Sequence, residues 1–224
     1  MEFRDLPSPN HGPRKTAIDM LVLHYTGMES AAAALARLTS PAAAVSAHYL
    51  IEEDGTVWRL VPEERRAWHA GQSFWRGVRD INSASIGIEL VNPGHELGYR
   101  TFPEAQIAAL ETLAAAVLAR HRIPARHVLG HSDVAPARKE DPGELFPWRR
   151  FAQVGIGLWP EPPLPKPPRA IAPLLAAIGY DPDAASAATV RAFQRHFRPA
   201  RCDGKADEET RSLAAAVAKL CGGI

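Results

Sequence analysis

Cysteine is scarce in this sequence, and the little that is present does not indicate a disulfide framework. Only Cys202 and Cys221 occur in 224 residues, and neither has a second cysteine at the spacing of a metal knuckle. Whether the two pair is left open, because a disulfide depends on Cα separation and direction and not on spacing along the chain.

An excess of charge and a long apolar run are also missing. The chain has 26 basic and 25 acidic residues, a net charge of +1, so we expect neither nucleic acid nor an anionic membrane as a partner. No window approaches the roughly 18 apolar residues that span a bilayer, and the first ten residues contain no apolar segment of an export signal. We therefore expect a cytoplasmic protein without membrane insertion. A periplasmic or envelope-associated protein would look the same after removal of an export signal.

Prolines gather in one stretch, residues 158–168, whose last nine positions hold six of them. Such a composition predicts an extended, semi-rigid spacer. It divides a first domain, residues 1–157, from a C-terminal module, residues 169–224. A module of that size is marginal on burial alone.

The first domain alternates strand-like and helix-like segments. β-prone runs cover residues 18–24, 48–51, 56–61, 85–91 and 128–129, and Asp54-Gly55 predicts a hairpin between the second and third. Helices are expected over 31–38 and 101–121. Thr101 and Glu104 predict a capping box at the start of the second helix, with Pro103 at its first helical position. These elements predict an α/β fold, a mixed central β-sheet flanked by helices.

The C-terminal module reads as three helices. Apolar positions at helical spacing mark one helix from Ile171 to Ile178 and a second around Val190 to Phe197. A third begins near Asp207, which is a suitable N-cap residue. The fold class is therefore α/β followed by a small three-helix domain.

Residues 130–143 form the most informative stretch, because this one segment holds His131, Lys139 and Asp141 together with two prolines. Pro136 and Pro142 lack an amide donor and restrict the residue before them, so we expect an irregular loop and no helix or central strand. Functional side chains are found disproportionately on such loops.

Recognisable zinc motifs are missing, since neither H-E-x-x-H nor paired C-x-x-C occurs. Among nine histidines, His24 and His131 stand out because each lies where a β-prone run meets a glycine-bearing turn. Taken singly, each is better explained as a hydrogen-bonded loop histidine. Glu89 lies in the middle of an apolar strand, where it is either a general base or a solvent-facing residue, and periodicity does not separate the two.

Several motifs occur in an order that resembles one family, the zinc-dependent N-acetylmuramoyl-L-alanine amidases of type 2, which share their fold with the peptidoglycan recognition proteins. The motifs are LHYTG at 23–27, SAHYLI at 46–51, AWHAG at 67–71, SIGIELVN at 85–92 and the loop 130–143 continued through FPW at 146–148. The resemblance covers nearly the whole first domain.

The resemblance implies a role for each of five residues. His24, His131 and Asp141 would be the ligands of one zinc ion per chain. Glu89 would be the base that takes the proton from the zinc-bound water, and Lys139 would stabilise the oxyanion. These roles agree with the chemistry of zinc, which lowers the pKa of bound water and polarises a carbonyl.

Further histidines and aromatic residues are weaker candidates. Candidate substrate contacts are Tyr25, His69, Trp75, Asn92 and Arg138, although a packing role for His69 is equally compatible. His48, in a hairpin strand, is expected to be structural. Surface or helix-flanking positions without a partner are expected for His11, His95, His121, His127 and His196.

The C-terminal module resembles the type 1 peptidoglycan-binding domains through IGYD at 178–181, VRAFQRHF at 190–197 and DGKADEET at 203–210. The resemblance implies binding to the cell wall. Such modules also serve as structural or oligomer contacts, and the sequence does not indicate the oligomeric state.

The expected activity is hydrolysis of the amide between the lactyl group of N-acetylmuramic acid, or its 1,6-anhydro form, and L-alanine of the stem peptide, in cell-wall turnover and recycling. Soluble anhydro-muropeptides and larger peptidoglycan fragments are the competing substrates. The alternative is a catalytically silent muropeptide-binding protein, which the presence of Asp141 and Glu89 disfavours. A Cys/His hydrolase is disfavoured too, because both cysteines lie far along the chain from these motifs.

Overall fold

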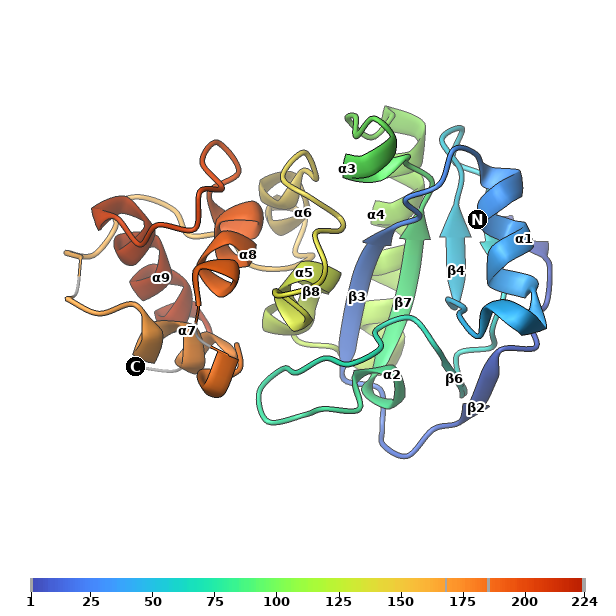
Figure 1. The fold of residues 1–224 in the computed structure, drawn as a ribbon, viewed down its shortest axis with the longest axis horizontal. Coiled ribbons are helices and arrows are strands. Elements are labelled where there is room, and N and C mark those ends of the chain that lie inside the picture. The colour runs from blue at the N-terminus through green and yellow to red at the C-terminus, as the bar shows by residue number, and fades with distance from the viewer. Residues whose placement is uncertain (1, 168, 185, 223–224) are drawn as a thin grey trace.

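A mixed β-sheet forms the centre of the molecule. The computed structural model describes residues 2–167, 169–184 and 186–222 (Figure 1). Within this part of the chain, six strands pair in the order β1-β5-β4-β7-β3-β8. They are β1 (Arg4–Asp5), β5 (Val57–Arg59), β4 (Tyr49–Ile51), β7 (Ser85–Leu90), β3 (Met20–Tyr25) and β8 (Val128–Gly130). A separate ribbon pairs β2 (His11–Pro13) with β6 (Arg65–Ala67).

Strand directions confirm the predicted mixed sheet. β4, β7, β3 and β8 run parallel to one another, β5 is antiparallel to β4, and β1 is parallel to β5. The predicted hairpin joins the antiparallel pair: Gly55 has φ +89°, and the Asp54 carboxylate accepts a hydrogen bond from the Thr56 amide at 2.9 Å. A left-handed residue of this kind favours glycine.

Helices flank the sheet, as the sequence predicts. The α-helices are α1 (Ala31–Thr39), α2 (Ile81–Ala84), α3 (Gly94–Leu97), α4 (Glu104–His121), α5 (His131–Val134), α6 (Trp148–Gln153), α7 (Ala172–Ile178), α8 (Ala187–Phe197) and α9 (Glu208–Leu220), with short 3-10 turns at Pro41–Ala43, Ala125–His127 and Pro182–Ala184. Long α4 lies behind β7 in Figure 1, and α1 lies beside β4. None of the helices in the described ranges is both long and apolar enough to cross a membrane.

The two faces of the central strands pack against different partners. Residues such as Leu21 in β3 and Ile88 in β7 share one apolar cluster with α4. Because side chains alternate along a strand, Met20 and Val22 face the opposite side, where they join a cluster with the C-terminal helices. His24 shares that second face by its even spacing from Met20 and Val22. His24 therefore lies on the face of the sheet that is turned away from α4.

Two local predictions are wrong. The capping box at Thr101 does not form: α4 begins at Glu104 after an extended Pro103, without a side-chain cap. Glu104 instead accepts two hydrogen bonds at 2.6 Å from Arg150 of α6, a bidentate ion pair that draws its carboxylate outward. The loop after β8 is not wholly irregular either, because the single-turn α5 fits between Gly130 and Pro136.

The C-terminal helices form where the apolar spacing predicts them, and Asp207 caps α9 by accepting from the Thr210 amide at 3.0 Å. They are not held away from the sheet by the proline-rich stretch. Figure 1 shows α7, α8 and α9 grouped at the end of the molecule beyond β8, and their apolar side chains share one cluster with the sheet. A small helical unit that buries too little surface alone gains stability from this shared core. Pro168, Ala185, Gly223 and Ile224, within the ranges assigned to the linker and module, lie outside the described residues.

Candidate metal centre and active site

The chemistry-bearing residues meet where three parallel strands end. His24 is the last but one residue of β3, Glu89 the last but one of β7, and His131 directly follows β8. His24 pairs in register with Glu89, and its neighbour Leu23 pairs with Gly130. The carboxyl ends of parallel strands share one sheet edge, so the topology brings together residues that are far apart in sequence.

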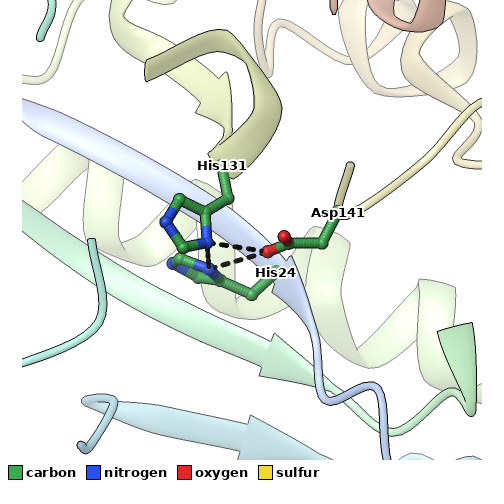
Figure 2. Close-up of side chains that lie close together, drawn as sticks. All are labelled: His24, His131 and Asp141. Atoms are coloured by element: carbon green, nitrogen blue, oxygen red, sulfur yellow. Dashed lines mark hydrogen bonds and ion pairs between the residues drawn. The ribbon is translucent and has the colours of Figure 1, made fainter. Parts of the chain in front are cut away.

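Three donor atoms form a nearly equilateral triangle at this edge (Figure 2). The Nδ1 atoms of His24 and His131 are 2.9 Å apart, and each lies 3.0 Å from Oδ2 of Asp141. All three side chains are buried. Asp141 reaches the site because the Ser132 amide donates to the Asp141 carbonyl at 2.9 Å, which closes the loop on itself.

Hydrogen bonds on the far side of each imidazole assign its tautomer. Nε2 of His131 lies 3.1 Å from the Ala70 carbonyl, which can only accept, so Nε2 carries the proton. The tautomer of His24 is set by a series of hydrogen bonds that begins at Ser85. The Ser85 hydroxyl donates to the Ile81 carbonyl at 2.6 Å and therefore accepts from Nε2 of His69 at 3.2 Å.

The position of the proton on His69 in turn fixes the position of the proton on His24. With its proton on Nε2, neutral His69 has a free lone pair on Nδ1, which accepts from Nε2 of His24 at 3.0 Å. Nδ1 of His24 is then without a proton. Burial, together with nearby His131, lowers the pKa of His24 to about 4, so the ring is neutral near pH 7. The two imidazoles and the carboxylate thus direct lone pairs at one point.

This arrangement fits a divalent metal. Three acceptor atoms with no hydrogen between them repel one another unless a cation lies among them. Ligands bound to a tetrahedral zinc at about 2.0–2.1 Å lie about 3.3 Å apart, close to the spacing of the triangle. Burial alone would raise the pKa of Asp141, but His131 and His24 outweigh it and keep the pKa below its ordinary range, so Asp141 is ionised.

Glu89 and Lys139 add a carboxylate and an amine to the site. Both line the same cavity as the triangle. Oε2 of Glu89 is buried and has no hydrogen-bond partner within the described residues. Burial, reinforced by the charge of Asp141, raises the pKa of Glu89 well above its ordinary value, while Lys139 opposes the shift. An unpartnered carboxylate aimed into a cavity is placed to exchange a proton with a ligand.

The cavity has a volume of about 570 Å³, the size of a small-molecule site. Its lining mixes apolar, acidic and basic groups. The side chains beyond the triangle, Glu89 and Lys139 include Tyr25, Thr26, Met28, Arg37, Leu38, Trp68, His69, His95, Glu96, Arg138 and Glu140.

Of the weaker substrate candidates, Tyr25, His69 and Arg138 line the cavity, but Trp75 and Asn92 do not. Trp75 is 2% exposed and packs edge-on against Tyr180, with ring centroids 5.0 Å apart. The Asn92 amide is also buried, where it donates to the Arg100 carbonyl at 2.7 Å and accepts from the Gly94 amide. Both residues shape the fold and lie outside the cavity lining.

His48 is structural, as expected, because its ring accepts from the Gly87 amide at 2.9 Å and lies 3.1 Å from the Arg65 carbonyl. The prediction that five other histidines lack partners is wrong. His196 is buried against Asp133, and His95 bonds Tyr25. Ring contacts of the others join His11 to Arg65, His121 to Glu63 and His127 to Asp19.

Ser85 was missed by sequence reasoning, although a signal for it was present. Ser85, Gly87 and Glu89 alternate along β7 and must share a face. A Cβ on Gly87 would lie 2.5 Å from Cγ of His69, so glycine lets this ring lie flat on the strand. Strand β7, which bears Glu89, therefore also holds His69, the hydrogen-bond partner of His24, in place through Ser85 and Gly87.

A buried His-His-Asp set, an unpartnered carboxylate and a lysine in one cavity are the parts of a metal-dependent hydrolase. The sequence model of the family described as N-acetylmuramoyl-L-alanine amidase matches residues 14–144, more than half of the chain. The protein belongs to this family of metal-dependent amidases. The prediction of an amidase is thereby confirmed.

Individual relatives of this chain are also named as amidases. N-acetylmuramoyl-L-alanine amidase AmiD of Escherichia coli is 41% identical over 234 residues, which cover 92% of this chain and 84% of that protein. A structure of AmiD with the substrate anhydro-N-acetylmuramic acid-L-Ala-D-γ-Glu-L-Lys superposes with a TM-score of 0.83 at 40% identity, covering 94% of this chain and 93% of that one. AmpDh3 of Pseudomonas aeruginosa, in complex with anhydromuramic pentapeptide, gives 0.82 at 36% identity, covering 93% and 94%.

Proposed function

We propose that this amidase is a zinc enzyme that hydrolyses the bond between the lactyl carbonyl of N-acetylmuramic acid, including its 1,6-anhydro form, and L-alanine of the stem peptide. The observation that carries the proposal is the triangle of proton-free donors in the same cavity as Glu89, whose Oε2 has no hydrogen-bond partner among the residues that the structure describes. The anhydromuramyl peptides bound to AmiD and AmpDh3 support the choice of substrate.

His24, His131 and Asp141 would hold the zinc. When bound, zinc acts as a Lewis acid that makes a water more acidic and polarises the scissile carbonyl. Glu89 accepts the proton of the attacking water at Oε2, the oxygen left without a partner, and later returns a proton to the leaving amine of L-alanine.

Lys139 stabilises the charge that appears on the carbonyl oxygen as the carbon becomes tetrahedral. It lies in the loop between His131 and Asp141 and lines the cavity with Glu89. A fixed positive group aimed at a developing oxyanion typically contributes about 3–4 kcal/mol to the barrier reduction. Water is the nucleophile in this scheme, and no acyl-enzyme forms.

A paired measurement tests the proposal. Metal analysis of the purified protein should find about one zinc per chain, and a muramoyl tripeptide should be cleaved by the zinc-loaded protein but not after chelation. Glu89→Gln is the matched control, because it should bind zinc and the peptide without turnover. Tight peptide binding with no cleavage by zinc-loaded wild type would instead support the silent binding protein.

The C-terminal helices, by their resemblance to peptidoglycan-binding domains, would additionally hold the enzyme on the cell wall. Deleting them would expose the cluster that they share with the sheet, so full-length Glu89→Gln is the suitable reagent. It should co-sediment with insoluble wall sacculi in the presence of saturating soluble muropeptide, which blocks the catalytic cavity. Complete release by the soluble ligand would rule out a second wall-binding surface.

A further inference from the structure

Asp133 is a buried carboxylate next to the metal site that takes no part in the chemistry. It lies two residues after His131 in α5 and is 2% exposed. A buried carboxylate is costly unless donors surround it. One donor is local, the Gly130 amide at 2.8 Å. The others come from the C-terminal module, one from α8 and one from the segment just after α7.

Tyr180 and His196 supply those donors. The Tyr180 hydroxyl donates to Oδ1 of Asp133 at 2.6 Å, and Nδ1 of His196 donates to Oδ2 at 2.7 Å. Burial, with the nearby Asp133, raises the pKa of Tyr180 well above its ordinary value, so the hydroxyl keeps its proton. Both oxygens of Asp133 are therefore held by residues from beyond the proline-rich stretch.

Each donor is itself rigidly seated. His196 stacks on Trp148, with ring centroids 3.7 Å apart and 19° between the planes. Tyr180 packs edge-on against Trp75 of the first domain. Because packing locks both side chains, the position of Asp133 is set by α8 and the end of α7.

A second contact reaches the other end of the same loop. Arg195 of α8, 6% exposed, forms an ion pair with Glu140. Glu140 lies directly between Lys139 and Asp141, the proposed oxyanion residue and the third ligand. The C-terminal helices thus contact the loop beside His131 and again beside Asp141.

An apolar surface alone would be enough to dock three helices, and the shared cluster already supplies one. The polar contacts add geometric specificity, since buried hydrogen bonds demand defined positions. Here they end on neighbours of the metal ligands. The hydrogen bond that closes the loop joins Ser132 and Asp141, the residues next to the two contact points, Asp133 and Glu140.

We propose that the C-terminal helices position the metal-binding loop, with Tyr180 and His196 fixing Asp133 and Arg195 fixing Glu140, and so determine how tightly the protein binds its metal. Tyr180, His196 and Arg195 are positioning residues, because their hydrogen bonds and ion pairs in the described part of the chain end on Asp133, Glu140 and Glu144, and not on the donor triangle. The proposal rests on the metal site proposed above and gives the module a function inside the enzyme besides any contact with the wall.

The test uses full-length Tyr180→Phe and His196→Gln, with Leu213→Ala as the control. Leu213 belongs to the same apolar cluster but lies on α9, which supplies neither of the donors to Asp133, and its truncation lowers the overall stability. Two quantities are measured: the zinc dissociation constant, by competition with a chromophoric chelator, and the hydrogen exchange rate of the Ser132 amide in metal-free protein.

Tyr180→Phe and His196→Gln should weaken zinc binding about tenfold or more and speed Ser132 exchange by a similar factor. Leu213→Ala should leave both within about twofold despite its lower melting temperature. Unchanged values in both positioning variants, or equal changes in Leu213→Ala, would overturn the proposal. If wild type binds no zinc, the proposed zinc enzyme fails, and the exchange rates still decide whether the helices position the loop.

Discussion

Ser85→Ala gives the sharpest test of how the fold prepares the proposed metal site, because Ser85 does not touch that site and is connected to His24 only through a hydrogen bond to His69. The substitution removes one oxygen from a fully buried position. The proton on Nε2 of His69 then loses its acceptor. Moving that proton to Nδ1 would place it against the proton on Nε2 of His24, which lies 3.0 Å away. His24 would have to turn its proton toward the metal.

The size of the effect follows from the cost of the buried donor. An unpaired buried N–H costs about 1–3 kcal/mol. Metal binding needs the original tautomer of His24, which leaves the N–H of His69 unpaired, so this free energy is subtracted from the free energy of metal binding. Each 1.4 kcal/mol changes the dissociation constant by a factor of about ten. Zinc affinity of Ser85→Ala should therefore fall about five- to a hundredfold, in the range seen when groups behind metal-bound histidines are removed.

Competition with a chromophoric chelator measures the dissociation constant, and Ser83→Ala is the control. Ser83 is equally buried and donates to Asp80 at 2.8 Å, but it takes no part in the chain behind His24. It should lose stability and keep its zinc affinity. Equal zinc affinity for wild type and Ser85→Ala would refute the assignment, as would an Nδ1 proton on His24 in imidazole 15N spectra of metal-free wild type.

Three further outcomes are expected. Glu89→Gln should lower kcat about 10²- to 10⁴-fold and leave zinc affinity within a few-fold, and a kcat near wild type would remove Glu89 as the base. Lys139→Met should lower kcat about 10²- to 10³-fold in steady-state cleavage assays, and an effect confined to KM would contradict an oxyanion role. Burial and Arg14 lower the pKa of His48 to about 3. Between pH 6.5 and 3 the unfolded chain therefore binds a proton at His48 that the folded protein does not bind. The free energy of unfolding falls as the pH is lowered through this window, by up to about 1.4 kcal/mol per pH unit. Denaturant unfolding of metal-free protein should show a flatter pH dependence for His48→Gln, and an unchanged slope would exclude this residue as a cause.

Local patterns predicted the strands well, because their signals lie within a few residues. The alternation in β7 put Glu89 opposite Ile88, and Asp54-Gly55 marked the hairpin. The donor triangle was not readable from spacing, since His24 and Asp141 are separated by 117 positions. Only the family resemblance joined them in the sequence, and the parallel pairing of β3 with β8 now gives the physical reason.

The errors share one cause, which is competition from distant residues. Glu104 had the right spacing for a capping box, but Arg150 offered two charged hydrogen bonds from another helix. His196 looked like a helix-flanking residue because its partner, Asp133, precedes it by 63 positions. The packing of the C-terminal helices on the sheet is a separate matter from these errors. The prolines of residues 158–168 predict a spacer, and composition carries no information about the apolar surface that the helices beyond them bury.

We propose that the site formed by His24, His131 and Asp141 makes this protein a zinc amidase. The most direct measurement is mass spectrometry of an anhydro-muramyl tripeptide incubated with chelator-stripped protein before and after addition of one equivalent of zinc. We expect free tripeptide and anhydro-muramic acid only after zinc is restored. An intact substrate with zinc present, or equal cleavage without it, would contradict the claim.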